Sequence, residues 1–425
     1  MPESYLVIGG SGFLGSHIVN GLLNRGESSV AVFDIVQRVF DDRIVFFSGD
    51  ICNEKQLVDA IQKCQASVII HTASPAPEAP KEVHQRVNVE GTRTVIAAAV
   101  SCAVPKLVYT SSAGVVFNRN NIVDADERMP FPQSEESYNT TKQMAEDIVI
   151  AANGKDGLAT CALRPAGIFG PRDRLMMPSA AQAVTRGQWT IQIGKNDNIF
   201  DWTYVDNVVL AHLLACDKLS LATPPLANDE LGNALPQVTL TTGFRRIPTS
   251  AAKPIGPSPH PDKEELAAQE EFNDPSTQQV RPVLRTKFDA LSPTALGIDY
   301  DEDKSPLKVA GNTFFITGGE PLYQWDFFRA IWTALGADID MKKMWHIPRS
   351  LGQWLALGAE SWGWITGKGT NFTPFRVHYL TAERWHNIEK ARRVLGYEPI
   401  VGVEEGIKRT VAWWLADQAE KTSEK

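Results

Sequence analysis

The chain has 425 residues, of which 43% are hydrophobic and 22% charged, and this composition excludes a disordered or fibrous protein. The 42 basic and 50 acidic residues give a net charge of -8 without a basic stripe, so we expect no nucleic-acid partner. The five cysteines form no CxxC pair, and no histidine stands at metal-ligand spacing, which predicts reduced core thiols and no metal site.

The first half of the chain alternates short apolar runs with segments of helical periodicity. We expect buried strands at six runs: Tyr5–Ile8, Val30–Phe33, Ile44–Phe47, Val68–Ile70, Leu107–Tyr109 and Thr160–Leu163. Helices are predicted between several of them, over Ser16–Asn24, Glu54–Cys64 and Val87–Cys102. This alternation predicts an α/β fold with a doubly wound parallel sheet that helices cover on both faces.

The loop after the first predicted strand carries Gly9, Gly12 and Gly15 in a GxxGxxG spacing before a helix. Glycine is needed where the chain turns sharply, where the backbone approaches a pyrophosphate, and where helix and strand pack closely. The free N–H groups at the helix start would bind the phosphates. Asp34, which closes the second strand, would bind the adenosine ribose and repel a 2′-phosphate. The pattern favours NAD, while Arg38 leaves NADP open.

Tyr138 and Lys142 are four residues apart and share one face of a predicted helix. A free tyrosine has a pKa of about 10, and a nearby ammonium lowers that pKa by favouring the phenolate. The phenolate could remove the proton of an alcohol while hydride leaves the same carbon. Thr110, Ser111 and Ser112 supply hydroxyls at the carboxyl end of the preceding strand, where such sheets bind ligands. Together these residues predict a dehydrogenase or reductase site.

A change in composition marks the middle of the chain. Twelve of the 26 prolines lie between Ala222 and Ala310, where aromatic residues are scarce and periodicity is weak. We interpret residues 221–310 as a Pro-rich insertion that is partly disordered, with an ordered lid over the substrate as the alternative. It would separate a dinucleotide-binding and catalytic domain (1–220) from a substrate-binding and membrane-associating C-terminal region (311–425).

Tryptophan is concentrated towards the end of the chain, since none of the eleven precedes Trp189. The apolar segment 350–366 is marginal for a membrane span but suits a helix in the membrane interface, or a lip through which an apolar ligand enters. A helix packed on the domain is the alternative. The membrane candidates are Trp354, Trp362 and Trp364. Trp325 and Trp332 are interpreted as helix packing.

Several motifs occur in an order that resembles the extended short-chain dehydrogenase/reductases and, within them, the 3β-hydroxysteroid dehydrogenase branch. They are GxxGxxG, GDI, HTAS, NVEGT, YTSSAGVVF, YNTTK, LRPAGIFGP, FDWTYVDNVVLAHLLA and ARRVLGYEPIVGVEEGI. The resemblance covers roughly Tyr5–Ser220 and Asn312–Trp414. It implies a Rossmann fold of the extended type with a smaller, mostly helical C-terminal substrate region. Dimerisation is an expectation from the fold alone.

The resemblance also implies roles for individual residues. Tyr138 would be the general base, Lys142 would lower its pKa and bind the nicotinamide ribose, and Ser112 would anchor the reacting oxygen. Asn88 would brace the central helix. The other residues implied to contact the cofactor are Gly9, Gly12, Phe13, Leu14, Gly15, Asp34, Asp50, Ile51, Thr72, Ala73, Ser74, Pro165 and Ile168.

The implied reaction, a step of sterol biosynthesis, oxidises the 3β-hydroxyl of a 4α-carboxysterol with NAD or NADP and releases the 4-carboxyl as carbon dioxide. A dehydrogenase or reductase of another 3β-hydroxysteroid or triterpenoid would use the same catalytic residues and stays open. A nucleotide-sugar epimerase shares the glycine loop and the Tyr–Lys pair, but the Trp-rich C-terminal region argues against a charged sugar.

A dinucleotide sensor without catalysis would not need Tyr138, Lys142 and Ser112 together. The chain shows no signal-peptide pattern and no uninterrupted apolar run of the length that a membrane span needs. We therefore expect a location in the cytoplasm or on the cytoplasmic face of the endoplasmic reticulum membrane, with peripheral contact through 350–366.

Overall fold

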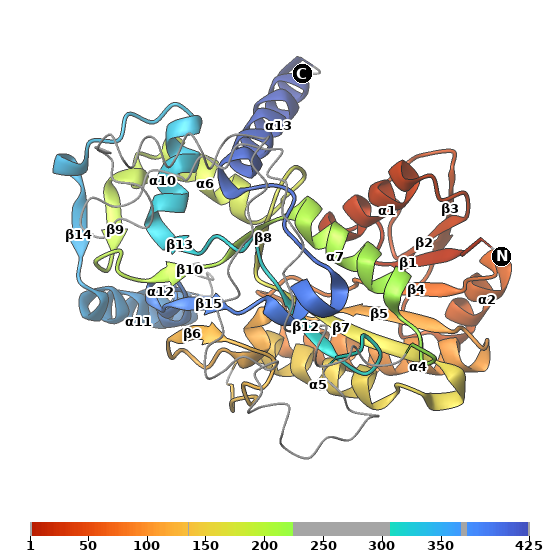
Figure 1. Ribbon diagram of the computed structural model, residues 1–425. Coiled ribbons are helices and arrows are strands. Elements are labelled where there is room, and N and C mark those ends of the chain that lie inside the picture. Colours follow the sequence, from red (N-terminus) through yellow and green to blue (C-terminus); the bar gives the residue numbers. More distant parts are fainter. Residues whose placement is uncertain (1, 135, 224–306, 367–371, 424–425) are drawn as a thin grey trace, which may run out of the picture.

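The computed structural model describes residues 2–134, 136–223, 307–366 and 372–423 (Figure 1). The predicted Pro-rich insertion lies almost entirely outside the described residues. Both interpretations of it, partial disorder and an ordered lid, concern those residues. All five cysteines are free thiols; Cys161 and Cys216 are fully buried, whereas the other three are half-buried. The prediction of core thiols is therefore confirmed for two of the five cysteines.

The larger lobe is built on seven parallel strands in the order β12-β7-β5-β4-β1-β2-β3. The strands are β1 Tyr5–Ile8, β2 Val30–Asp34, β3 Ile44–Ser48, β4 Val68–His71, β5 Lys106–Thr110, β7 Ala159–Pro165 and β12 Thr313–Ile316. Six of them lie within two residues of the predicted runs, because strands buried on both faces have continuous apolar sequences. The parallel order confirms the predicted doubly wound α/β fold.

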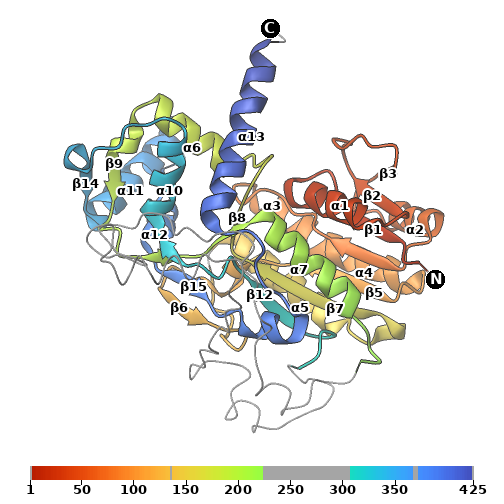
Figure 2. The same cartoon turned by 45° about the horizontal axis from the view of Figure 1, so that its top comes forward.

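Helices cover both faces of the sheet (Figures 1 and 2). Two helices, α1 Phe13–Arg25 and α7 Val205–Lys218, pack on one face of the sheet and form a hydrophobic core with it. Three helices, α2 Glu54–Cys64, α4 Thr92–Ser101 and α5 Ser137–Ala151, form a second hydrophobic core on the other face. Helix α2 has the predicted bounds because the Asn53 side chain accepts a hydrogen bond from the N–H of Gln56 and caps it.

The predicted helix over 87–102 is longer and less regular than its sequence indicates. It begins with α3 Lys81–His84, continues as the π-helical segment η1 Gln85–Gly91, and runs directly into α4. Apolar periodicity does not reveal a π-helical turn, because one extra residue per turn hardly alters the pattern over so short a length. The irregular turn matters here because it carries Asn88, which contacts the candidate site.

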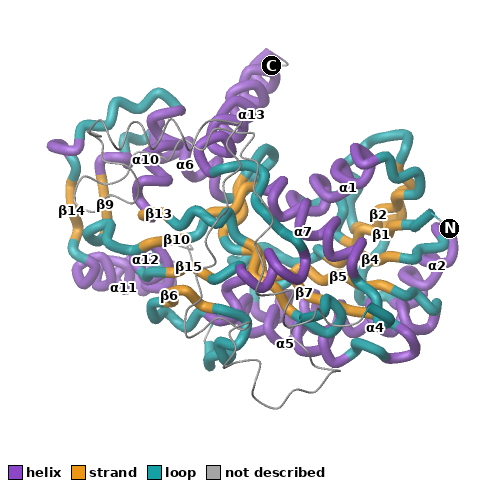
Figure 3. The backbone as a smooth tube through the Cα atoms, in the orientation of Figure 1, coloured by secondary structure: helices purple, strands orange, loops and turns teal. Residues whose placement is uncertain are grey.

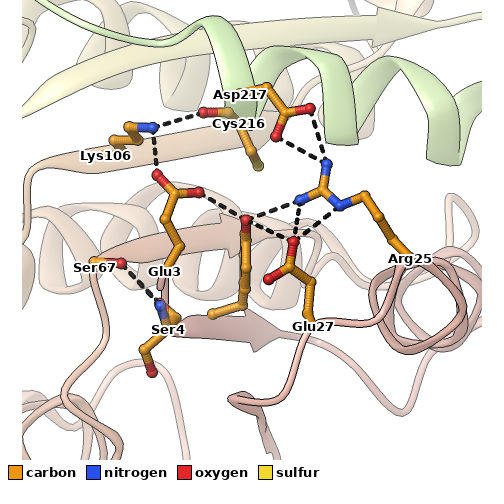
Figure 4. A network of polar contacts seen from close by, with 9 residues as sticks. Glu3, Ser4, Arg25, Glu27, Ser67, Lys106, Cys216 and Asp217 are labelled. Atoms are coloured by element: carbon orange, nitrogen blue, oxygen red, sulfur yellow. Dashed lines mark hydrogen bonds and ion pairs between the residues drawn. The ribbon is translucent and has the colours of Figure 1, made fainter. Parts of the chain in front are cut away.

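A polar network ties the elements together at the amino-terminal edge of the sheet (Figure 4). Glu3 accepts hydrogen bonds from Lys106 Nζ at 2.5 Å and from the Tyr5 hydroxyl at 2.7 Å. Arg25 donates to the Tyr5 hydroxyl at 2.8 Å and pairs with Asp217 at 2.8 Å. These contacts join β1, β5, α1 and α7 at the edge opposite the glycine loop.

The smaller lobe is mainly helical, with only short strands (Figure 3). The strand β6 Ile122–Ala125, which precedes α5 in the chain, pairs with β15 of this lobe. The strands of the lobe are β8 Gly167–Phe169, β9 Ile191–Ile193, β10 Ile199–Phe200, β11 Trp202–Tyr204, β13 Leu322–Tyr323, β14 Trp345–Ile347 and β15 Arg384–His386. Its helices are α6 Met176–Thr185, α10 Gln324–Ala334, α11 Arg349–Thr366, α12 Pro374–Thr381 and α13 Val403–Ser423. Short helical turns are η2 Ala113–Val116, η3 Lys155–Gly157, η4 Gln188–Thr190, η6 Met341–Lys343 and η7 Ala391–Leu395.

Aromatic rings form the core of this lobe. The Trp202 ring stacks on Phe327 with the ring centroids 3.9 Å apart. Trp325 and Trp332 of α10 are buried and lie 6.2 Å apart, which confirms their interpretation as helix packing. Most of α13 projects away from both lobes, as Figures 1 and 2 show. Part of the concentration of tryptophan thus has a structural cause in the aromatic core.

Candidate active site

The first part of the candidate site is the loop between β1 and α1, at the carboxyl edge of the sheet. Gly9 has a φ of +81°, and a Cβ there would lie 2.7 Å from the backbone nitrogen of Ala73. A Cβ on Gly15 would lie 2.2 Å from the carbonyl oxygen of Gly9. No side chain caps the start of α1, so the N–H groups of its first turn are left for a ligand. Half-buried residues at this start are Gly12, Phe13 and Leu14.

Two acidic residues lie beside this loop. Asp34 ends β2, and its Oδ2 accepts a hydrogen bond from the N–H of Ser11 at 3.0 Å, which fixes the carboxylate against the glycine turn. Asp50 follows β3 and forms an ion pair with Arg86 of η1. Its neighbour Ile51 is buried in the core. Sequence reasoning missed Arg86, because its partner lies 36 residues earlier in the chain and on another element.

Two further loops complete the same edge. After β4, the Thr72 hydroxyl donates to the last carbonyl of β1 at 2.9 Å, and Ser74 donates to Asn88 Oδ1 at 3.1 Å. After β7, which ends at Pro165, the chain enters β8, where Ile168 pairs in parallel with β11. Segments that are far apart in the sequence, and that were each predicted to contact the cofactor, therefore meet at one edge of the sheet.

The predicted base and the predicted anchoring serine lie together above this edge. Tyr138 is in the first turn of α5, and its phenol lies close to the Ser112 and Ser74 hydroxyls. Ser112 precedes η2, and its Oγ accepts the N–H of Gly114 at 3.0 Å, which holds the hydroxyl in place. Such a cluster of three hydroxyl groups can hold an alcohol or carbonyl oxygen and exchange a proton with it.

Lys142 is buried one turn further along α5. Its Nζ donates to the carbonyl oxygen of Thr110 and lies 4.3 Å from the centroid of the Tyr109 ring. Burial lowers the pKa of Lys142 to about 7, and the carboxylate of Glu146 opposes this shift. The ammonium is thus held by β5 and titrates in the neutral range.

Burial also dominates at the phenol and raises the pKa of Tyr138, while the hydrogen bonds with Ser112 and Ser74 act in the opposite direction. The predicted lowering of this pKa by Lys142 stays a prediction, since the lysine is engaged with β5. The protein alone therefore favours the neutral phenol, and forming the phenolate requires further positive charge in the site.

Polar side chains brace the helix that carries the tyrosine. Asn88 Nδ2 donates to the Thr141 hydroxyl at 3.0 Å, as expected of a residue that braces this helix. His84 is buried, lies 2.8 Å from the Ser137 hydroxyl, and places its ring 5.7 Å from the Tyr138 ring. His84 was not identified from the sequence, because a single histidine in a helical pattern gives no sign of which residues it touches.

Comparisons with known proteins agree with this arrangement. Residues 6–230 match the 3-beta hydroxysteroid dehydrogenase/isomerase family. The chain is 34% identical to the decarboxylating sterol-4-alpha-carboxylate 3-dehydrogenase of Candida albicans, over 98% of each chain. It is 35% identical to the protein of the same description from Saccharomyces cerevisiae, over 97% of each chain. A solved structure of Thermus thermophilus UDP-glucose 4-epimerase with NAD covers 97% of this chain and 99% of its own, with a TM-score of 0.57 and 18% identity. That structural likeness shows the fold alone.

Proposed function

The chain belongs to the 3-beta hydroxysteroid dehydrogenase/isomerase family, and from this premise we propose that it oxidises the 3β-hydroxyl of a 4α-carboxysterol with NAD and releases carbon dioxide, as a step of sterol biosynthesis. The observation that carries the proposal is the neighbouring Tyr138 and Ser112 hydroxyls beside a glycine loop. It occurs in a chain that matches enzymes of that description over almost its whole length.

The residues of the glycine loop fit a dinucleotide. The close approach of Gly15 to the Gly9 carbonyl leaves no room for a side chain, and the uncapped start of α1 would hold the pyrophosphate. NAD, when bound, would accept the hydride and add positive charge near the phenol. Asp34 would bind the adenosine ribose and repel a 2′-phosphate, which favours NAD over NADP. Pro165 and Ile168 would approach the carboxamide.

Ser112 would hold the oxygen of the 3β-hydroxyl, and Tyr138 would take its proton as the C3 hydrogen leaves as hydride. The Lys142 ammonium would bind the nicotinamide ribose and stabilise the phenolate. The product is a β-keto acid. Its bond to the carboxyl group breaks with the electron pair moving towards the ketone, carbon dioxide leaves, and C4 then takes up a proton. The decarboxylation therefore needs no second catalytic base.

Incubating the pure protein with NAD and matched 3β-hydroxysterols, with and without a 4α-carboxyl, tests this function. We expect NADH and carbon dioxide in equal amounts from the carboxylated sterol, and slower turnover with NADP. The two products are measured by absorbance and by trapping the released gas. Oxidation only of sterols that lack the carboxyl group would contradict the proposed decarboxylation.

We also propose that α11 makes peripheral contact with a membrane, on the cytoplasmic face of the endoplasmic reticulum. Trp354 and Trp362 are 73% and 68% exposed, and Leu351 and Leu355 are exposed on the same stripe of the helix. Aromatic rings of this kind suit the membrane interface, where an apolar sterol would also be found. Figure 1 shows α11 at the outer end of the smaller lobe. No helix among the described residues is long and apolar enough to cross a membrane. The side chain of Trp364 lies outside the described residues.

Replacing Trp354 and Trp362 together by serine is expected to weaken liposome binding by roughly tenfold or more. The reason is that the variant no longer transfers two large rings from water into the membrane interface on binding. Activity on sterol dissolved in detergent should stay the same. The measurement is co-sedimentation with vesicles of neutral lipid. Leu415→Ser, which removes an apolar side chain of α13 that is 53% exposed, serves as control. Equal binding by all three proteins would favour the alternative of a helix packed on the domain.

A further inference from the structure

Arg384 of β15 is a buried cation that forms no ion pair with any acidic residue of the described ranges. Its side chain is 5% exposed. Nη2 donates to the backbone carbonyl of Tyr379 at 2.7 Å, whereas Nε is buried without a hydrogen-bond partner. Asp201, whose N–H binds the Arg384 carbonyl, directs its carboxylate to His386 instead. A buried charge normally has a counter-ion, and among the described residues this guanidinium has none.

Three aromatic rings surround the guanidinium. The distances from Arg384 Cζ to the ring centroids are 3.5 Å for Tyr379, 4.5 Å for Phe200 and 4.6 Å for Phe117. Cation–π contacts stabilise a desolvated cation, but they offer no acceptor for its remaining N–H groups. Burial lowers the pKa of Arg384, and the Tyr379 phenol opposes this shift. We call Phe117, Phe200, Tyr379 and Arg384 the arginine cage.

The arginine cage lies next to segments that carry residues of the candidate site. Phe117 follows η2, the turn that the anchoring serine begins. Phe200 packs on Gly167, where a Cβ would lie 2.8 Å from the ring, in the segment proposed to approach the nicotinamide. The Tyr379 ring packs edge-on against the Phe117 ring, with the centroids 6.4 Å apart. The cage therefore adjoins the proton-transfer site on the side of the smaller lobe.

We propose that Arg384 binds the carboxylate of the substrate and makes the enzyme select sterols that carry a 4-carboxyl group. This inference rests on the function proposed above. A carboxylate supplies both the negative charge and the acceptor atoms that the guanidinium lacks, and arginine can bind it through two parallel hydrogen bonds. The rings of the cage would contact the apolar sterol on either side of the charged group.

The contribution of Arg384 falls on binding rather than on the chemical step. The carboxylate that it holds is the group that later leaves as uncharged carbon dioxide, so the interaction does not grow stronger as the reaction proceeds. An interaction of that kind lowers KM and leaves kcat for the oxidation nearly unchanged. Arg384 is thus a specificity-determining residue and takes no part in proton or hydride transfer.

The test compares a 4-carboxysterol with its methyl ester, which keeps the shape but lacks the charge, and measures NADH formation. The wild type should prefer the acid by roughly 10- to 100-fold in kcat/KM, mostly through KM. Arg384→Met should lose this preference, and Arg384→Lys should keep part of it. The ratio of the two substrates is measured on one preparation, so a loss of folded protein cancels. Arg376→Met of α12, which removes a surface pair with Glu78, is the matched control.

Each outcome decides between roles. If Arg384→Met loses activity equally on the acid and the ester, the role of Arg384 is only to hold α12 in place through its hydrogen bond to the Tyr379 carbonyl. That result overturns the inference. A wild type without preference for the acid overturns it as well. A wild type that turns over neither substrate refutes the proposed function itself, because that result does not depend on any change at Arg384.

Discussion

Tyr138→Phe is expected to abolish nearly all NADH formation, with kcat lowered by roughly 100- to 10,000-fold. The substitution removes the hydroxyl that meets Ser112 and Ser74 and leaves the ring in its place against His84. The variant can still bind NAD, because the glycine loop lies on a different segment. We therefore expect its affinity for NAD to change by no more than a few-fold, as measured by titration calorimetry alongside steady-state kinetics.

Tyr5→Phe is the matched control for this variant. It removes a buried phenol hydroxyl that is hydrogen-bonded to Glu3 and Arg25 at the opposite edge of the sheet. Its kcat should equal that of the wild type, although its stability should fall because a polar network loses its central group. Normal turnover by Tyr138→Phe would show that the phenol takes no part in the mechanism. A loss of turnover in both variants would indicate damage to the fold.

The features predicted well from the sequence are those that depend on neighbouring residues. Strands buried on both faces appear as apolar runs, so Tyr5–Ile8 was predicted with the bounds that the structure has. The glycine spacing and the Tyr138–Lys142 spacing each lie within one turn or loop. Their places in the fold could therefore be predicted before the fold was known.

The features that sequence reasoning missed depend on residues brought together by the tertiary fold. Arg86 meets Asp50, His84 meets Tyr138, and Arg384 meets its cage only because separate elements converge. No periodicity or spacing records such pairs, since their separations in the chain carry no regular pattern. Dimerisation and the state of the insertion stay predictions for a related reason: the first depends on a second chain, and the second falls outside the described residues.

Glu146→Ala is expected to lower the free energy of unfolding by about 3–5 kcal/mol. Glu146 of α5 and Arg164 of β7 form an ion pair whose side chains are 2% and 4% exposed, with Arg164 Nε 3.0 Å from Oε2. Without the carboxylate, the guanidinium stays buried and unpaired, and its Nη1 already has no hydrogen-bond partner. Equilibrium denaturation measures the loss. Glu405→Ala, which breaks the exposed pair with Arg409, should cost only about 0.5 kcal/mol.

The same substitution should change the pH dependence of catalysis. Burial lowers the pKa of Lys142 to about 7, and Glu146 limits this shift, so removing Glu146 lowers the pKa further. The ammonium is then lost at a lower pH, and kcat should begin to fall at a lower pH than in the wild type. Glu146→Leu combined with Arg164→Met separates the two effects, because apolar replacement of both partners should restore most of the stability without restoring the charge beside Lys142. A wild-type pH profile in this stable double variant would show that the ion pair supports the fold alone.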